Sequence, residues 1–137
     1  MFRSCSSVKA LLTATAVIEF GAGLALLCCP STMVELLVGA PLDAPAAVTV
    51  ARVGGAGLLA LSVACWLSRG DANSRAAKGL VAGMLLYNVA TVAILGYAGV
   101  GLGLFGVALW PGVALHAVMA VWCVECLRRA ITRPRSA

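Results

Sequence analysis

The stretch that decides the fold is residues 10–29, ALLTATAVIEFGAGLALLCC, which is long and apolar enough to cross a membrane as a helix. A helix rises about 1.5 Å per residue, so about 20 apolar residues span the hydrocarbon core of a bilayer, about 30 Å thick. Its one charged residue is Glu19, near the middle. We therefore predict a membrane-spanning helix that carries a carboxyl group at mid-depth.

Three further stretches of this kind follow, at residues 45–67, 79–98 and 104–126. Of the 137 residues, 62% are hydrophobic and 11% are charged, and the mean hydropathy is +1.03. A soluble domain carries about 25% charged residues, so this chain has too few charges to coat a soluble globule. We predict a single all-α domain over residues 1–137, a bundle of four transmembrane helices in a lipid bilayer, with a basic tail over 127–137.

The connections between the stretches are short. Thr32 and Glu35 have the spacing of a capping box, and Gly39 follows the apolar run after them, which predicts a short interfacial helix over 32–38. An irregular loop is the alternative. The glycine-rich segment 99–103 predicts a tight turn, and loops this short make consecutive helices antiparallel neighbours.

The basic residues predict an orientation. The net charge is +5, and nine of the ten Lys and Arg residues fall on one side of a four-span arrangement: Arg3, Lys9, Arg69, Arg75, Lys78, Arg128, Arg129, Arg133 and Arg135. The positive-inside rule then places both termini in the cytoplasm, and we expect the membrane to be a bacterial inner membrane. Since these residues sit at segment ends without interleaved aromatic residues, nucleic acid is not an expected partner.

Polar side chains in the other three helices are predicted to lie near the depth of Glu19. Counting along the segments places Asn88 and His116 at about this depth, with Tyr87 beside Asn88 and Arg52 nearer the outer boundary. A charge at the bilayer centre costs at least about 2.5–3.5 kcal/mol, so an ionisable residue there should face the bundle interior and find a partner. The five residues form the predicted interior polar cluster.

Arg52 is the predicted partner of Glu19, because it brings the opposite charge and a fork of hydrogen-bond donors. The pair would then fix which helix faces which, with Asn88 and His116 as interhelical hydrogen-bond partners. Alternatively, Glu19 is protonated, since a low dielectric disfavours the charged form, and it then donates a hydrogen bond. In a functional interpretation, the cluster lines a small polar pocket or a proton or solute pathway. His116 is expected to be a satisfied interior histidine, and neither a metal site nor a cofactor is expected.

Glycines recur at spacings that let membrane helices approach closely. They are Gly21 and Gly23 in the first helix, Gly54, Gly55 and Gly57 in the second, and Gly79 and Gly83 in the third. The pattern suits a compact bundle and a homo-oligomer equally well. Pro111 is expected either to kink the fourth helix or to mark the start of its regular part.

Cys123 and Cys126 form a C-x-x-C in the last helix. A four-helix membrane protein with this motif resembles thiol–quinone enzymes of the vitamin K epoxide reductase type. However, the predicted orientation places the pair at the cytoplasmic end, where thiols stay reduced. The cysteines are therefore expected to be mainly small apolar packing residues, and membrane redox chemistry remains a minor hypothesis.

A broader resemblance covers residues 13–125. It is carried by Glu19 in the first helix and by the segments LLVGAP 36–41, ARVGGAGLLAL 51–61, LLYN 85–88 and LWPGVALH 109–116. With these motifs the chain resembles small four-helix membrane proteins loosely related to the DoxX-like group. The resemblance implies a four-helix bundle and assigns no catalytic residue.

Three hypotheses for the function remain. The chain contains no glycine-rich phosphate loop, nucleophile elbow or H-E-x-x-H motif, so we do not expect an enzyme. The first hypothesis is a structural or small-ligand-binding membrane protein with an interior polar cluster. The second is a small proton-coupled transporter that uses Glu19. The third is a membrane thiol or quinone redox protein that uses Cys123 and Cys126.

Overall fold

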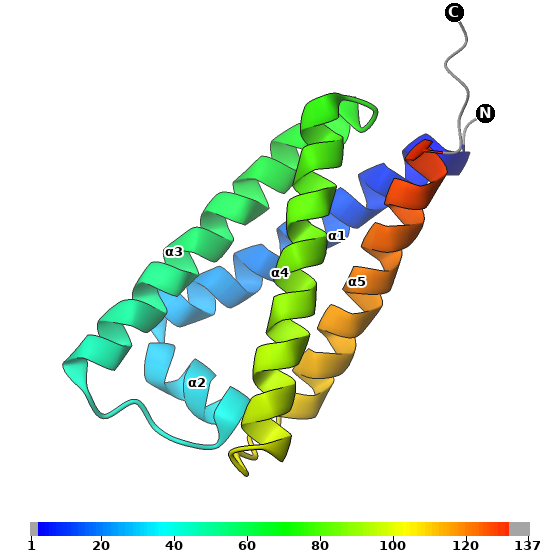
Figure 1. The fold of residues 1–137 in the computed structure, drawn as a ribbon. Helices are drawn as coiled ribbons and strands as arrows, with labels where there is room; N and C mark the ends of the chain where they lie inside the picture. The colour runs from blue at the N-terminus through cyan, green and yellow to red at the C-terminus, as the bar shows by residue number, and fades with distance from the viewer. Residues whose placement is uncertain (1–2, 132–137) are drawn as a thin grey trace, which may run out of the picture.

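The computed structural model describes residues 3–131, and the side chains of residues 6–129. Within them the chain is all-α, without a strand (Figure 1). Its elements are α1 (Arg3–Cys28), α2 (Pro30–Val38), α3 (Pro45–Ser68), the short 3-10 helix η1 (Arg69–Asp71), α4 (Arg75–Val100) and α5 (Leu109–Ile131). Four helices, α1, α3, α4 and α5, are long and apolar enough to cross a membrane. The predicted all-α bundle with four membrane-length helices is confirmed.

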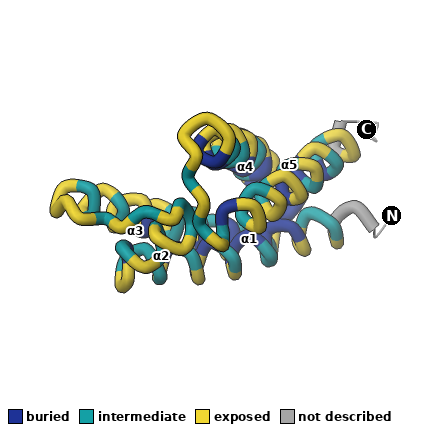
Figure 2. Tube along the Cα trace, turned by 90° about the horizontal axis from the view of Figure 1, so that it is seen from below, coloured by how far each residue is buried: buried dark blue, intermediate teal, exposed yellow. Residues whose placement is uncertain are grey.

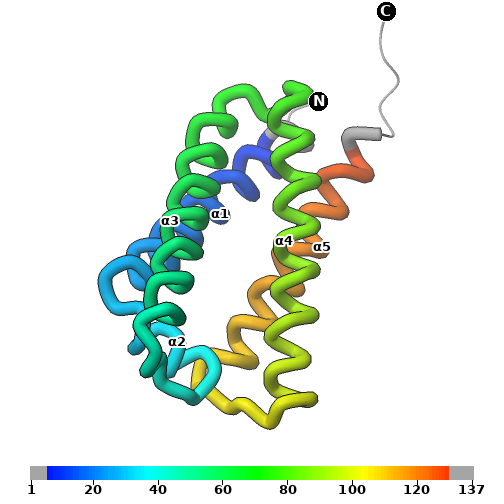
Figure 3. Tube along the Cα trace, turned by 60° about the vertical axis from the view of Figure 1, so that its left-hand side comes forward, coloured from blue at the N-terminus to red at the C-terminus, as the bar shows by residue number. Residues whose placement is uncertain are grey.

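The long helices associate as two pairs. The most extensive contacts join α1 to α3 and α4 to α5, whereas α3 and α4 contact each other much less (Figure 3). The start of α1, the turn at η1 and the end of α5 lie at one end of the molecule, and α2 lies at the opposite end beside the start of α3 (Figure 1). The start of α1 and the end of α5 therefore lie at the end that carries the connection between α3 and α4, which we call the termini end. The opposite end is called the α2 end.

The core between the pairs lies toward the termini end. It contains mostly aliphatic and sulfur-containing side chains: Leu11, Leu12, Ala16, Cys65, Ala77, Val81, Met84, Met119, Cys123 and Cys126. The outward faces of the helices are largely exposed (Figure 2), and they carry large apolar side chains such as Val50, Leu86 and Val121. Apolar surface of this extent is what a lipid-facing helix presents.

Helices α1 and α3 approach each other closely at two glycines. A Cβ at Gly23 would stand 2.8 Å from the carbonyl oxygen of Gly55, and a Cβ at Gly55 would stand 2.8 Å from the carbonyl oxygen of Gly23. The two backbones therefore touch where any larger residue would hold them apart, as glycine permits in membrane helix pairs. Nearer the termini end, the Ser62 hydroxyl of α3 donates to the Ala16 carbonyl oxygen of α1 at 2.7 Å.

The other glycines of the predicted pattern make no such contact. Gly21, Gly54, Gly57, Gly79 and Gly83 have no atom of another segment within 4 Å of the position that a Cβ would take. Among the described residues, the close approach predicted from Gly79 and Gly83 is thus absent, and both glycines are exposed. Spacing alone could not distinguish an inward glycine from an outward one.

The short helix predicted over 32–38 is present as α2, but its start differs from the prediction. It begins at Pro30, with Cys29 at the N-cap and no side-chain capping bond, so the capping box of Thr32 and Glu35 was wrong. Proline suits the first turn of a helix because its missing N–H would have no helical partner there. The end is as predicted: Gly39 adopts a left-handed conformation with φ of 74°, and its N–H donates to the Glu35 carbonyl oxygen.

The fourth long helix starts later than predicted, at Leu109 instead of residue 104. Pro111 is therefore in the first turn, where it costs no hydrogen bond. The preceding residues contact α2 instead: the Ala108 N–H donates to the Leu36 carbonyl oxygen at 2.8 Å. Gly106 fits against the same turn of α2, where a Cβ would overlap backbone atoms of Leu36 and Leu37.

The other helices are longer than predicted. The first begins at Arg3 instead of residue 10, and α4 runs over Arg75–Val100 instead of 79–98. The start of α4 is fixed by Ser74, whose hydroxyl oxygen accepts from the Ala77 N–H at 3.0 Å. The added turns lie beyond the apolar parts of these helices. Hydropathy identifies the apolar parts, but by itself it does not detect such helix ends.

Candidate functional site

Glu19 lies on α1 with only 4% of its surface exposed. The Tyr87 hydroxyl of α4 donates to its Oε2 atom across 3.4 Å, which is long for a hydrogen bond between oxygens. A carboxylate can accept about four hydrogen bonds. The buried carboxyl group of Glu19 therefore keeps most of its acceptor capacity.

The predicted partner Arg52 does not meet Glu19. Arg52 is exposed on α3, and the ion pairs among the described side chains both involve Glu125, with Arg128 and Arg129. The predicted Glu19–Arg52 pair was wrong, because the register of α1 against α3 set by the Ser62–Ala16 bond places Arg52 about 10 Å from the level of Glu19, toward the α2 end. Arg52 is exposed there, and its long side chain can extend toward the membrane surface.

Asn88 and His116 join α4 to α5. The Asn88 amide donates to the Met84 carbonyl oxygen at 2.7 Å, and its Oδ1 atom lies 2.7 Å from Nδ1 of His116. Since an amide oxygen only accepts, Nδ1 of His116 carries the proton in this arrangement. Asn88 is 2% exposed, so both of its polar atoms are satisfied inside the bundle, and the predicted interhelical contact between these residues is confirmed.

Tyr87 connects the two hydrogen-bonded pairs. Its ring meets the His116 ring edge to face, with 5.5 Å between centroids and 84° between planes. Its neighbour on α4 is Asn88, so one turn of α4 carries the side chains that contact Glu19 on α1 and His116 on α5. The structure thus brings together Glu19, Tyr87, Asn88 and His116, four of the five predicted residues, which we call the interior cluster.

The interior cluster lies where the two helix pairs face each other. The backbones of α1 and α4 make few direct contacts, so Glu19 and Tyr87 join the pairs through their side chains alone. One helical turn before Glu19, the Thr15 hydroxyl is fully buried and has no hydrogen-bond partner among the described residues. Burying a hydroxyl without a hydrogen-bond partner costs free energy. This part of the interior therefore contains more polar groups than its internal hydrogen bonds satisfy.

Sequence reasoning missed Ser62, whose hydroxyl is buried and bonds to the backbone of α1. The signal was a lone serine in an apolar helix, which in a membrane is a common donor to a neighbouring helix. Its bond holds α3 to α1 and does not reach Glu19, so Ser62 supports the α1–α3 pair and is outside the interior cluster.

The C-x-x-C cysteines lie in the core at the termini end. Cys123 and Cys126 are buried free thiols. Cys126 Sγ lies 3.6 Å from the hydroxyl oxygen of Ser7, which in turn accepts from the Trp122 indole N–H at 3.2 Å. These contacts are those of packed core residues. In the described part of the chain, no three His, Cys, Asp or Glu side chains are placed to hold a metal ion.

Comparisons with known proteins return no match to this chain among protein-family models, curated proteins or solved structures. They therefore identify no enzyme family for it.

Proposed function

We propose that this chain is a four-span integral membrane protein of a bacterial inner membrane, with both termini in the cytoplasm, that binds a small organic cation at Glu19. The four membrane-length helices support the membrane location. The clustering of basic residues at the termini end supports the orientation. The resemblance to DoxX-like membrane proteins is compatible with this proposal and remains a prediction.

The observation that supports a cation site is that no cationic side chain of the described residues pairs with Glu19. The carboxyl group is 4% exposed, its recorded hydrogen bond is the 3.4 Å contact from Tyr87, and Arg52 lies elsewhere. An ionised carboxyl group in such a place needs a positive partner. The Tyr87 ring adds a surface that attracts cations through its π-electrons, so an alkylammonium group suits the site better than a metal ion.

Ligand-dependent stability tests this proposal. Tetramethylammonium is titrated into the purified protein in detergent while unfolding is followed. We expect saturable stabilisation, about 1.4 kcal/mol at ten times the dissociation constant, in the native chain and in Glu35→Gln, which removes an exposed carboxyl group. Glu19→Gln should fold, but tetramethylammonium should not stabilise it. No saturable stabilisation, or equal stabilisation of Glu19→Gln, would refute the cation site and leave Glu19 a purely structural hydrogen-bond acceptor.

A second candidate function is proton-coupled transport. The same observation favours it, because a carboxyl group without a fixed cation is free to exchange a proton for a cationic solute. In proteoliposomes with an internal pH dye, an imposed gradient of alkylammonium ions should then move protons through the native protein and not through Glu19→Gln. Binding without proton movement would support the binding protein over the transporter.

A further inference from the structure

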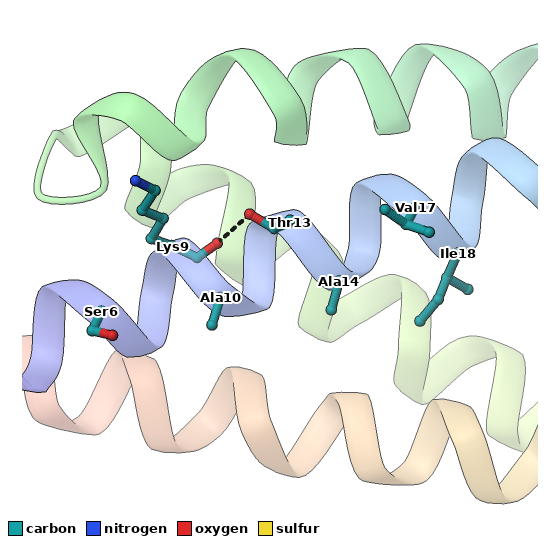
Figure 4. Close-up of a pocket in the computed structure, with 7 residues that line it drawn as sticks. All are labelled: Ser6, Lys9, Ala10, Thr13, Ala14, Val17 and Ile18. Atoms are coloured by element: carbon teal, nitrogen blue, oxygen red, sulfur yellow. Dashed lines mark hydrogen bonds between the residues drawn. The ribbon is translucent and has the colours of Figure 1, made fainter.

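Two apolar grooves flank α1 on the outside of the bundle, away from the interior cluster. The first lies along the α1–α3 seam, has a volume of about 390 Å³ and is lined by Ala16, Val17, Phe20, Ser62, Val63, Trp66 and Leu67. The second is a shallow groove of about 650 Å³ on the exposed face of α1, formed by side chains of this helix alone: Ser6, Lys9, Ala10, Thr13, Ala14, Val17 and Ile18 (Figure 4). Val17 belongs to both grooves and forms the ridge between them.

A cationic side chain stands at the termini end of each groove. Lys9 lines the second groove directly. At the first groove, the Arg69 guanidinium lies over the Trp66 indole, 3.1 Å from the ring centroid, and Trp66 is one of the lining residues. A stacked guanidinium is held in place, so Arg69 is fixed at the mouth of the groove.

The helix register brings the two cations to one level. Since α1 and α3 are antiparallel, the hydrogen bond between Ser62 and Ala16 aligns their backbones. Lys9 precedes Ala16 and Arg69 follows Ser62 by the same number of residues, which places each cation about 10 Å beyond this bond toward the termini end. The 3-10 helix η1 contacts α1, and Figure 4 shows the Lys9 side chain extending toward that end of α3.

Among the described side chains, neither cation forms an ion pair. The ion pairs among the described side chains join Glu125 to Arg128 and Arg129 and leave Lys9 and Arg69 outside them. Two apolar grooves that share a ridge, with a positive charge at the head of each, match a molecule with two hydrocarbon chains and one negative headgroup. An anionic phospholipid has this form, and basic residues at the membrane surface attract such lipids.

We infer that the α1–α3 face binds one anionic phospholipid, with its acyl chains in the two grooves and its phosphate between Lys9 and Arg69. The site is separate from Glu19 and does not depend on the cation proposal. A lipid site requires that the protein lies in a membrane, as proposed above. The proposed orientation then places the lipid in the cytoplasmic leaflet. Val63 and Leu67, which are 56% and 73% exposed, are then covered by the lipid chain.

Quenching of Trp66 by brominated lipids tests the inference. A Trp110→Phe/Trp122→Phe chain keeps Trp66 as its only tryptophan, and it is reconstituted with brominated phosphatidylglycerol in phosphatidylcholine, or with the reverse labelling. We expect phosphatidylglycerol to be preferred next to Trp66, by roughly fivefold for each basic residue. Lys9→Gln/Arg69→Gln should abolish the preference, whereas Lys9→Arg/Arg69→Lys should retain it.

The matched control is Arg75→Gln/Lys78→Gln, which removes the same charge from exposed positions at the start of α4 on the same side of the membrane. It should leave the preference intact. Equal quenching by both lipids in the native sequence would overturn the inference. So would an equal loss in the control pair, because that would mean a general attraction of the basic surface in place of a site at the grooves.

Discussion

Replacing Gly23 by alanine should weaken the bundle, whereas replacing Gly21, on the same helix, should not. The added Cβ at Gly23 would lie 2.8 Å from the Gly55 carbonyl oxygen and 3.0 Å from Leu59, but at Gly21 it would meet nothing within 4 Å. Carbon–oxygen contacts between membrane helices settle at about 3.3–3.6 Å, so α1 and α3 would have to separate by about 0.5 Å.

The magnitude follows from two opposing effects. Alanine favours a helix over glycine by about 1 kcal/mol, and this gain is common to both substitutions. Overpacking of a tight contact costs about 1–3 kcal/mol, and only Gly23→Ala incurs this cost. The difference in unfolding free energy between the two variants should therefore be about 1–3 kcal/mol, with Gly23→Ala the less stable.

The assay is reversible unfolding in mixed micelles by titration with sodium dodecyl sulfate, followed by circular dichroism. A second adjacent pair on α3 repeats the comparison, because Gly55 faces α1 and Gly54 does not. Gly23→Ala/Gly55→Ala should lower the unfolding free energy by less than the sum of the two single substitutions. The same separation of α1 and α3 relieves the overlap at both positions. Equal stability of Gly23→Ala and Gly21→Ala would refute the argument that α1 and α3 touch at these glycines.

Three further predictions follow from the interior and from the ends of the helices. Thr15→Val should leave stability unchanged or raise it by about 1 kcal/mol in the same titration, because the buried hydroxyl has no partner; a clear loss would mean that the hydroxyl is bonded. A double-mutant cycle between Asn88→Ala and His116→Ala should give a coupling of about 0.6–1.7 kcal/mol, the range of membrane hydrogen bonds; additive effects would contradict that bond. In a Cys5→Ser chain, a membrane-impermeant maleimide added to intact cells should label exposed Cys28 and Cys29; labelling only after lysis would reverse the proposed orientation.

Composition was enough to predict the number and kind of helices, because each apolar stretch has the length that a bilayer requires. The ends of the helices could be predicted less well from the sequence. The start of α5 depends on residues 104–108, which are as apolar as a helix but are held by α2 through Ala108 and Gly106. The hydropathy of the segment itself does not reveal such a tertiary contact.

The candidate site was predictable in part. Counting residues placed Glu19, Asn88 and His116 near one level, and the structure brings Asn88 and His116 into direct contact. Arg52 was assigned to the same interior because of its charge, yet the register of α1 against α3, seen in the Ser62–Ala16 bond and the Gly23–Gly55 contact, places it about 10 Å from the level of Glu19. The register depends on which of several glycines are in contact, and one sequence does not distinguish them.

The bond between Ala108 and Leu36 also has a consequence for the order of synthesis. The two ends of this contact are 72 residues apart in the chain, since 108 minus 36 is 72. When α1, α2 and α3 have left the ribosome, the segment that holds α2 has not yet been made. The bond between α2 and the segment before α5 therefore forms only after α4 has been made, and a chain that ends before residue 106 would carry α2 without this backbone partner.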